Sequence, residues 1–116
     1  MQYQDLIVWQ KAMELVEKTY ALTKILPREE IYGIDNQMRR AAVSIPSNIA
    51  EGKERNSDKE FAHLLSIARG SKAELETQFL ICVKLGYYTK EQVDNVLELC
   101  ADIGKMLSTL ILKVTG

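Results

Sequence analysis

Residues 57–92 read SDKEFAHLLSIARGSKAELETQFLICVKLGYYTKEQ, and this stretch decides the fold class. Ser57 followed by Glu60 has the capping-box spacing, in which a hydroxyl and a carboxylate satisfy exposed backbone donors at a helix start. The segment TKEQ, which begins at Thr89, repeats that spacing. Between the two segments apolar residues recur every three or four positions until Gly86, and glycine commonly ends a helix in the left-handed conformation. One long helix therefore ends, and another begins, inside this stretch.

The same three-and-four spacing of apolar residues extends over the rest of the chain. It predicts four helices, at about residues 5–26, 35–53, 58–85 and 90–115, with Asp5 as the first N-cap and Pro27 stopping the first helix. Short connections make sequential helices antiparallel neighbours. We therefore expect an all-α protein, an up-down-up-down antiparallel four-helix bundle, in a single domain that spans residues 1–116.

Pro46 falls inside the second predicted helix, in the stretch SIPSNIAEG. Proline removes a backbone hydrogen bond and clashes with the preceding turn, so an interior proline kinks a helix or requires compensation by neighbouring groups. We expect helix two to be kinked at Pro46, with Ser47 and Asn48 bonding to the opened backbone. The kink either shapes a binding surface or is purely architectural.

The first and fourth predicted helices carry apolar stripes broader than one inward face requires, and 47% of all residues are hydrophobic. Surplus apolar surface on a small protein typically marks an interface. We therefore expect a homo-oligomer, and a monomer with a larger core is the alternative.

Polar residues interrupt the apolar row of the third predicted helix. If helices two and three form a hairpin, the facing residue numbers sum to about 112, which sets Arg39 level with Ala73 and Arg40 level with Lys72. One of these arginines can therefore reach Glu74. Buried polar groups require partners, which predicts a partly buried ion pair from Arg39 or Arg40 to Glu74. Ser71 and Gln78 would complete this structural polar network.

Charge is unevenly distributed along the chain. Fifteen Lys and Arg stand against sixteen Asp and Glu overall, yet residues 36–73 alone carry a local excess of positive charge. Neutralisation of phosphates drives nucleic-acid binding, so Lys53, Arg55 and Lys59 are the candidate nucleic-acid contacts. The alternative is a solvated turn, because acidic residues alternate with these three cations.

No residue constellation specifies a reaction, a metal or a cofactor. A single histidine, His63, occurs in the chain, and its Glu60-x-x-His63 step is only one part of a di-iron site. Cys82 and Cys100 lie in apolar helical patterns and are expected to be buried and unpaired. We therefore predict no catalytic, metal or cofactor-binding residues, and a protein that is not an enzyme. Without a signal-peptide pattern or a membrane span, a cytoplasmic location is expected.

Three segments resemble a known bacterial family. DLIVWQKA from Asp5, QMRRAAVSIPSNIAEG from Gln37 and GSKAELETQ from Gly70 are similar to the four-helix bundle proteins also called 23S rRNA intervening-sequence proteins. The resemblance covers essentially the whole chain and implies a homopentamer, because known members form five-fold rings. It also implies an RNA or nucleoprotein partner, and a similar barrel is the accessory protein of diversity-generating retroelements. The family offers no catalytic residues to transfer.

Three functions follow as hypotheses. The first is a non-enzymatic homo-oligomeric scaffold that binds RNA or a nucleoprotein. The second is a protein-interaction adaptor that presents an apolar groove beside Pro46 to a partner helix and has no nucleic-acid role. The third is a small-ligand site in the polar cluster around Glu74.

Overall fold

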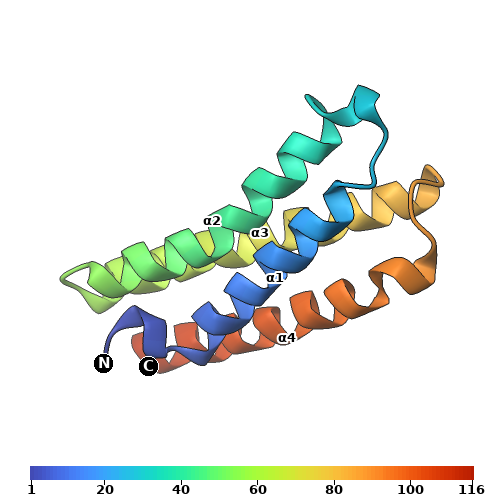
Figure 1. Ribbon diagram of the computed structural model, residues 1–116. Helices are drawn as coiled ribbons and strands as arrows, with labels where there is room; N and C mark the ends of the chain where they lie inside the picture. The colour runs from blue at the N-terminus through green and yellow to red at the C-terminus, as the bar shows by residue number, and fades with distance from the viewer.

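The computed structural model describes residues 1–116 and contains helices without strands, as the periodicity predicts (Figure 1). The molecule measures 43 × 24 × 19 Å. Four long helices follow one another along the chain: α1 (Ile7–Thr23), α2 (Ile34–Glu54), α3 (Asp58–Lys84) and α4 (Lys90–Thr115). Two short 3-10 turns, η1 (Tyr3–Asp5) and η2 (Arg28–Glu30), precede α1 and α2.

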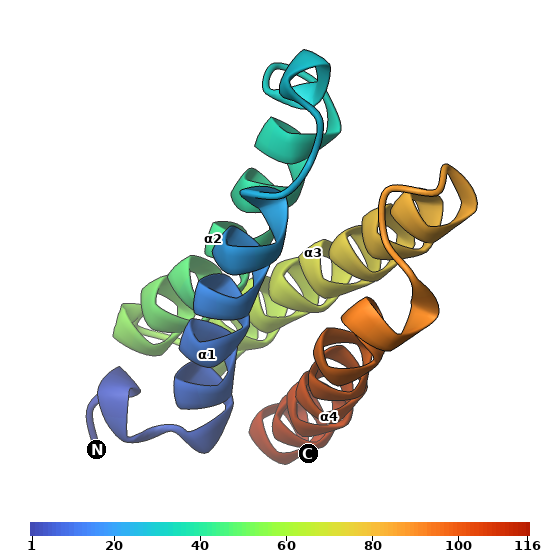
Figure 2. The same cartoon turned by 45° about the vertical axis from the view of Figure 1, so that its right-hand side comes forward.

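Consecutive helices pack side by side and run in opposite directions (Figures 1 and 2). A hydroxyl–hydroxyl contact of 2.9 Å joins Ser44 of α2 to Ser71 of α3. Arg69 of α3 donates to Ser108 of α4 at 3.2 Å. These contacts place the middle of α3 level with the middle of α2 and with the second half of α4, and short connections favour such antiparallel packing of neighbours.

The first helix is shorter at both ends than its apolar pattern predicts. Asp5 closes η1 instead of capping α1, because its carboxylate accepts a hydrogen bond from the backbone N–H of Gln2 at 3.1 Å. The chain leaves the regular helix after Thr23, although Leu26 stays buried. Apolar periodicity therefore continues past the helix end, since a residue in an irregular turn fills the core as well as a helical one.

The helix ends in the second half of the chain follow their capping signals to different extents. Thr89 and Gln92 form a complete capping box, with reciprocal bonds of 3.2 and 2.8 Å. Ser57 accepts from the backbone N–H of Glu60 at 3.2 Å, but the Glu60 carboxylate accepts from the Ser57 hydroxyl and not from its backbone. Gly86 adopts a φ of 80°, the left-handed conformation expected at the end of α3.

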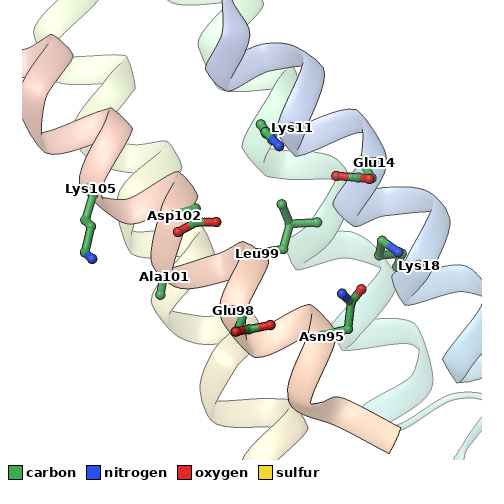
Figure 3. Close-up of a pocket in the computed structure, with 9 residues that line it drawn as sticks. All are labelled: Lys11, Glu14, Lys18, Asn95, Glu98, Leu99, Ala101, Asp102 and Lys105. Atoms are coloured by element: carbon green, nitrogen blue, oxygen red, sulfur yellow. The ribbon is translucent and has the colours of Figure 1, made fainter.

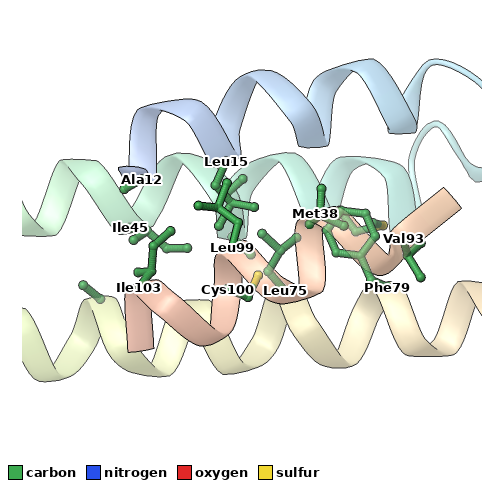
Figure 4. Close-up of a cluster of buried hydrophobic side chains, with 14 of the residues drawn as sticks. Ala12, Leu15, Met38, Ile45, Leu75, Phe79, Val93, Leu99, Cys100 and Ile103 are labelled. Atoms are coloured by element: carbon green, nitrogen blue, oxygen red, sulfur yellow. The ribbon is translucent and has the colours of Figure 1, made fainter. Parts of the chain in front are cut away.

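Side chains from all four helices meet in one apolar core (Figure 4). Leu15 of α1, Met38 of α2, Phe79 of α3 and Ile103 of α4 are completely buried there. Protein interiors are packed like organic crystals, so the loss of one large side chain from such a core typically costs several kcal/mol, about 2–5 for Leu or Ile to Ala.

Two tyrosines of the α3–α4 connection tie it to the connection between α1 and α2. The Tyr88 hydroxyl donates to the carbonyl oxygen of Leu22 at 2.7 Å. The Tyr87 hydroxyl donates to a Glu30 carboxylate oxygen, also at 2.7 Å. That bond stabilises the protonated phenol, which raises the pKa of Tyr87 above its ordinary value. The two connections therefore hold one end of the bundle together.

Helix α2 is continuous through Pro46, which is buried. The side-chain amide of Asn48 donates to the Ser44 carbonyl oxygen at 2.8 Å and to the Ser44 hydroxyl at 2.9 Å. This contact matches the expectation that Asn48 bonds to backbone near the proline. Ser47 is exposed and makes no such bond. A kink at Pro46 stays a prediction.

Surplus apolar surface lies mainly on α3 and not on α4. Helix α4 exposes one large apolar side chain, Leu112, because the rest of its stripe packs against the core. Helix α3 exposes three such side chains, which are Ile67, Leu80 and Ile81, and Leu85 directly after its last residue is also exposed. None of the helices is both long enough and apolar enough to cross a lipid bilayer.

Candidate nucleic-acid interface

The three predicted phosphate contacts lie around the turn between α2 and α3. Lys53 and Arg55 occupy the end of α2, and Lys59 lies in the first turn of α3. Gly52 permits this tight turn, because a Cβ there would lie 2.9 Å from the Phe61 ring. The fold therefore brings the three cations to one end of the bundle.

Carboxylates of the same turn neutralise Arg55. One guanidinium nitrogen lies 2.8 Å from a Glu51 carboxylate oxygen, and another lies 3.7 Å from Glu60. All three side chains are about half exposed, and exposed ion pairs of this kind contribute little stability. The pairs nevertheless reduce the positive field that Arg55 offers to a phosphate.

Lys53 and Lys59 differ in their surroundings. The Lys53 amine lies 6.0 Å from the centre of the Phe61 ring, and its stem is half-buried. Lys59 is exposed, and no carboxylate oxygen lies within 4.0 Å of its amine. Lys59 is therefore the cation of this turn that is most available to an external phosphate.

The turn also holds a histidine that the sequence analysis did not assign to the interface. His63 lines a hollow of about 430 Å³ together with Arg55, Lys59, Glu60 and Leu64, which we call the turn hollow. Its place one helical turn after Lys59 was the available signal, because residues four apart share a helix face. An imidazole there adds a hydrogen-bonding ring to the two cations.

The predicted ion pair to Glu74 does not form. Arg39 turns toward α1, where its Nε lies 2.8 Å from an Asp35 carboxylate oxygen and donates to the Thr23 hydroxyl at 3.0 Å. Its guanidinium also stacks over the Tyr20 ring, at 4.6 Å from the ring centre. Arg40 is exposed and makes no ion pair.

The other members of the predicted polar network are also arranged differently. Ser71 bonds to Ser44, and the Gln78 amide donates weakly to Glu74 at 3.4 Å. Glu74 is exposed, while the amide oxygen of Gln78 is buried without a partner. The small-ligand hypothesis therefore loses its site, because Arg39 is not among these residues.

A groove of about 510 Å³ runs between α1 and α4 (Figure 3). Its charged residues include both signs: Lys11, Glu14, Lys18, Glu98, Asp102 and Lys105. Three cations and three carboxylates leave the groove without a net charge, so it attracts neither phosphate nor metal strongly. No group of three or more His, Cys, Asp or Glu side chains is close enough to hold a metal ion.

An apolar groove of about 320 Å³ lies beside Pro46, between α1 and α2. We call it the α1–α2 groove, and its residues are Tyr3, Trp9, Met13, Val16, Val43, Pro46, Ser47 and Ala50. Met13 and Val43 are each about 40% exposed, which is unusual for large apolar side chains. The structure therefore contains the surface that the adaptor hypothesis requires.

Both cysteines are free and fully buried. Burial raises the pKa of the Cys82 thiol to about 11, with a further contribution from the Glu30 carboxylate. Burial likewise raises the pKa of Cys100 to about 12. Neutral, buried thiols are poor nucleophiles because the thiolate is the reactive form.

Comparison with known proteins identifies a family and similar solved structures. The family described as 23S rRNA-intervening sequence protein has a sequence model that matches residues 4–109. The chain is also similar to a crystal structure of a protein of unknown function from the S23 ribosomal protein family of Bacteroides thetaiotaomicron VPI-5482. These two chains are 27% identical with a TM-score of 0.84, over 90% of this chain and 98% of that chain. No curated protein matches the sequence.

Proposed function

Because this chain belongs to the 23S rRNA-intervening sequence protein family, we propose that it is a non-enzymatic, homo-oligomeric scaffold that binds RNA or a nucleoprotein in the cytoplasm. The turn hollow is the observation that supports the RNA part. There Lys59 lacks a carboxylate partner and adjoins Arg55 and His63 at one end of the bundle. A ring of such subunits repeats this small basic surface, and repetition strengthens binding through effective concentration.

Two features support a non-enzymatic role. His63 forms no hydrogen bond with a serine, threonine or cysteine, which is the contact that activates a nucleophile. Both thiols are buried and protonated at neutral pH. The two thiols and the single histidine are therefore not arranged as a nucleophile with its base.

RNA retention tests this proposal. Fluorescence anisotropy with a labelled single-stranded RNA of about 20 nucleotides should show binding that weakens steeply between about 50 and 200 mM salt. The double variant Lys53→Gln/Lys59→Gln should lower the slope of log affinity against log salt by about 1.4, since each lost contact to a single strand removes about 0.7. The matched control Lys24→Gln/Lys90→Gln removes the same charge from exposed sites elsewhere.

No retention at low salt would remove the RNA part of the proposal. Equal slopes for the two double variants would instead show that RNA contacts another surface. A binding isotherm that does not change with salt would also contradict phosphate recognition at the turn.

The apolar side chains left in solvent on α1, α2 and α3 support oligomer formation. The family resemblance indicates five copies, so light scattering at micromolar concentration should give a mass near five times the 13.2 kDa of one chain. A species of one chain mass under these conditions would contradict assembly.

The α1–α2 groove favours a second candidate function, an adaptor that binds an amphipathic helix of a partner protein. Apolar burial in this groove predicts capture that does not weaken between about 50 and 200 mM salt, unlike the RNA contact. Val43→Lys should abolish this capture. Protein capture that is lost in Val43→Lys and kept in Lys53→Gln/Lys59→Gln would separate the two functions.

A further inference from the structure

A third charged hollow, of about 480 Å³, lies between α3 and α4. Its walls are formed by Arg69 and Lys72 of α3 and by Gly104, Lys105, Ser108 and Thr109 of α4, and we call it the basic hollow. No carboxylate lines it. Three cations and two hydroxyl groups therefore face one depression, which is a set of groups that binds oxyanions.

Lys72 fits into this hollow because Gly104 of α4 has no side chain there. Only 15% of its side chain is exposed, and its amine lies 2.9 Å from a Glu76 carboxylate oxygen. A Cβ on Gly104 would lie 2.9 Å from both the terminal carbon and the amine of Lys72. Glycine inside a helix costs about 1 kcal/mol relative to alanine, and here it makes room for the ammonium group.

Arg69 and Lys105 are exposed and have no carboxylate within 4.0 Å. Figure 3 shows Lys105 at the edge of the groove between α1 and α4, with its side chain extending away from Lys11 and Glu14. Arg69 donates to the Ser108 hydroxyl oxygen at 3.2 Å. Because that oxygen accepts, the Ser108 hydroxyl hydrogen stays available to donate to a ligand.

The other two charged depressions lack this excess of positive charge. In the turn hollow, Glu51 and Glu60 pair with Arg55. The groove between α1 and α4 shares Lys105 with the basic hollow, and its cations and carboxylates are equal in number. In the basic hollow, Glu76 offsets Lys72 alone, so two cations remain without compensation.

We propose that the basic hollow binds a phosphate group, with Arg69, Lys72 and Lys105 as its cationic contacts and Ser108 and Thr109 as hydroxyl donors. The phosphate is either a free anion or part of a nucleic-acid backbone, since both present the same charged oxygens. This site differs from the turn hollow in position and in residues, so it does not depend on the RNA contacts proposed there.

Amide NMR on the intact protein tests the site with inorganic phosphate as the probe. At constant ionic strength set with NaCl, phosphate should shift the amide signals of Gly104, Ser108 and Thr109 in a saturable way. Arg69→Gln/Lys105→Gln should weaken this binding at least about tenfold, because charge-assisted bonds are roughly twice as strong as neutral ones. The control Lys90→Gln/Lys113→Gln removes two exposed lysines of α4 outside the hollow and should bind as the parent does.

Gly104→Ala supplies a test that is separate from folding. Alanine favours the helix, so this variant should melt at a higher temperature than the parent. The added methyl group displaces the Lys72 amine, so phosphate should bind severalfold more weakly. Unchanged binding in Gly104→Ala would overturn the role assigned to Lys72.

A second titration, with the single-stranded RNA used for the turn, identifies the source of the phosphate. Shifts of the same three amides with phosphate alone assign a free anion, and shifts with RNA assign the nucleic-acid backbone. If neither ligand moves these signals, or if both double variants weaken binding equally, the basic hollow is not a phosphate site. RNA retained in that case leaves the turn as the interface.

Discussion

At the scale of single residues, Arg39 shows how a third helix changes a pairing that two helices suggest. The sequence places an arginine of α2 within reach of Glu74 of α3, and that expectation considered only these two helices. In the structure α1 supplies the Tyr20 ring and the Thr23 hydroxyl, and Asp35 lies one turn before Arg39 on α2. Three favourable contacts on the α1 side exceed the single pair expected on the α3 side.

Replacing Arg39 should therefore be costly, while replacing its sequence neighbour should not. Arg39→Gln leaves the Asp35 carboxylate, which is 12% exposed, without its cation. Discounted for partial exposure, the expected loss is about 1–2 kcal/mol of unfolding free energy by urea denaturation. Arg40→Gln and Glu74→Ala, both at exposed positions, should each change it by less than about 0.5 kcal/mol. A large loss in Glu74→Ala would restore the abandoned ion pair.

The thiols give the folded protein a defined response to alkaline pH. A thiol in the unfolded chain titrates near 9.0, whereas Cys82 and Cys100 titrate near 11 and 12 in the folded protein. Their contribution to stability is fully present below pH 9 and is lost as the pH rises through 11–12, because the unfolded state ionises first. The melting temperature should therefore fall between pH 8.5 and about 11.

The matched control is Cys82→Ala/Cys100→Ala. Its melting temperature should be lower at pH 8 but should fall less between pH 8.5 and about 11. Below pH 9 a thiol reagent should label the parent only at the rate of unfolding, since both sulfur atoms are buried. Rapid labelling of the native protein at pH 8 would show that burial is incomplete.

At the scale of elements, helix type and extent are predictable from sequence because apolar spacing and caps act locally. Helices α2, α3 and α4 begin and end within one residue of the expected positions. The ends of α1 deviate because Asp5 satisfies η1 and because Leu26 packs inward from an irregular turn.

Register is harder to predict, because it depends on packing between helices. The Ser44–Ser71 contact sums to 115 where a hairpin estimate gave about 112, almost one helical turn of relative shift. At a sum of 115 Arg39 lies level with Glu76 and Arg40 level with Leu75, so the shift moves Arg39, and not Arg40, away from Glu74. The register shift does not change the location of the candidate cations at the α2–α3 turn, because the short connection between these helices fixes that location.

Replacing Gly70, inside α3, or Gly86, just after it, with alanine should change the unfolding free energy in opposite directions. Gly86 has a φ of 80°, a conformation that costs an L-residue about 1 kcal/mol, so Gly86→Ala should lower the unfolding free energy by about that amount. Gly70 lies in the helix interior with no atom within 4 Å of an added Cβ. Gly70→Ala should raise the unfolding free energy by up to about 1 kcal/mol. Chemical denaturation measures the unfolding free energy of both variants. A lower unfolding free energy for Gly70→Ala would indicate that this position contacts another chain.

At the scale of the whole molecule, two apolar surfaces lie on different helices. One is the α1–α2 groove, with Met13 and Val43 in solvent. The other is a ridge on α3, which we define as Ile67, Ile81 and Leu85. Ile81 and Leu85 are one turn apart, and Ile67 lies about four turns before Ile81 on the same side. A closed ring needs two different complementary surfaces on each subunit, whereas a two-fold dimer needs one that pairs with itself.

This distinction gives a test of the proposed ring that does not require the number of subunits in the parent assembly. Val43→Lys changes only the groove, and Ile81→Lys changes only the α3 ridge, so each variant alone should be monomeric by light scattering. In an equimolar mixture the intact ridge of the Val43→Lys subunit can bind the intact groove of the Ile81→Lys subunit. One native interface then forms per pair, and the mixture should contain a dimer that neither variant forms alone.

The stoichiometry of that mixture separates the modes of assembly. If each surface paired with itself, one intact surface per variant would still allow the parent contact between identical chains, and mixing would add nothing. If lysine at position 43 or 81 left the assembly unchanged, that surface would lie outside the interface and stay free for another partner. A dimer that appears only on mixing requires groove and ridge to meet between neighbouring copies, and such a ring would cover the groove that the adaptor function needs exposed.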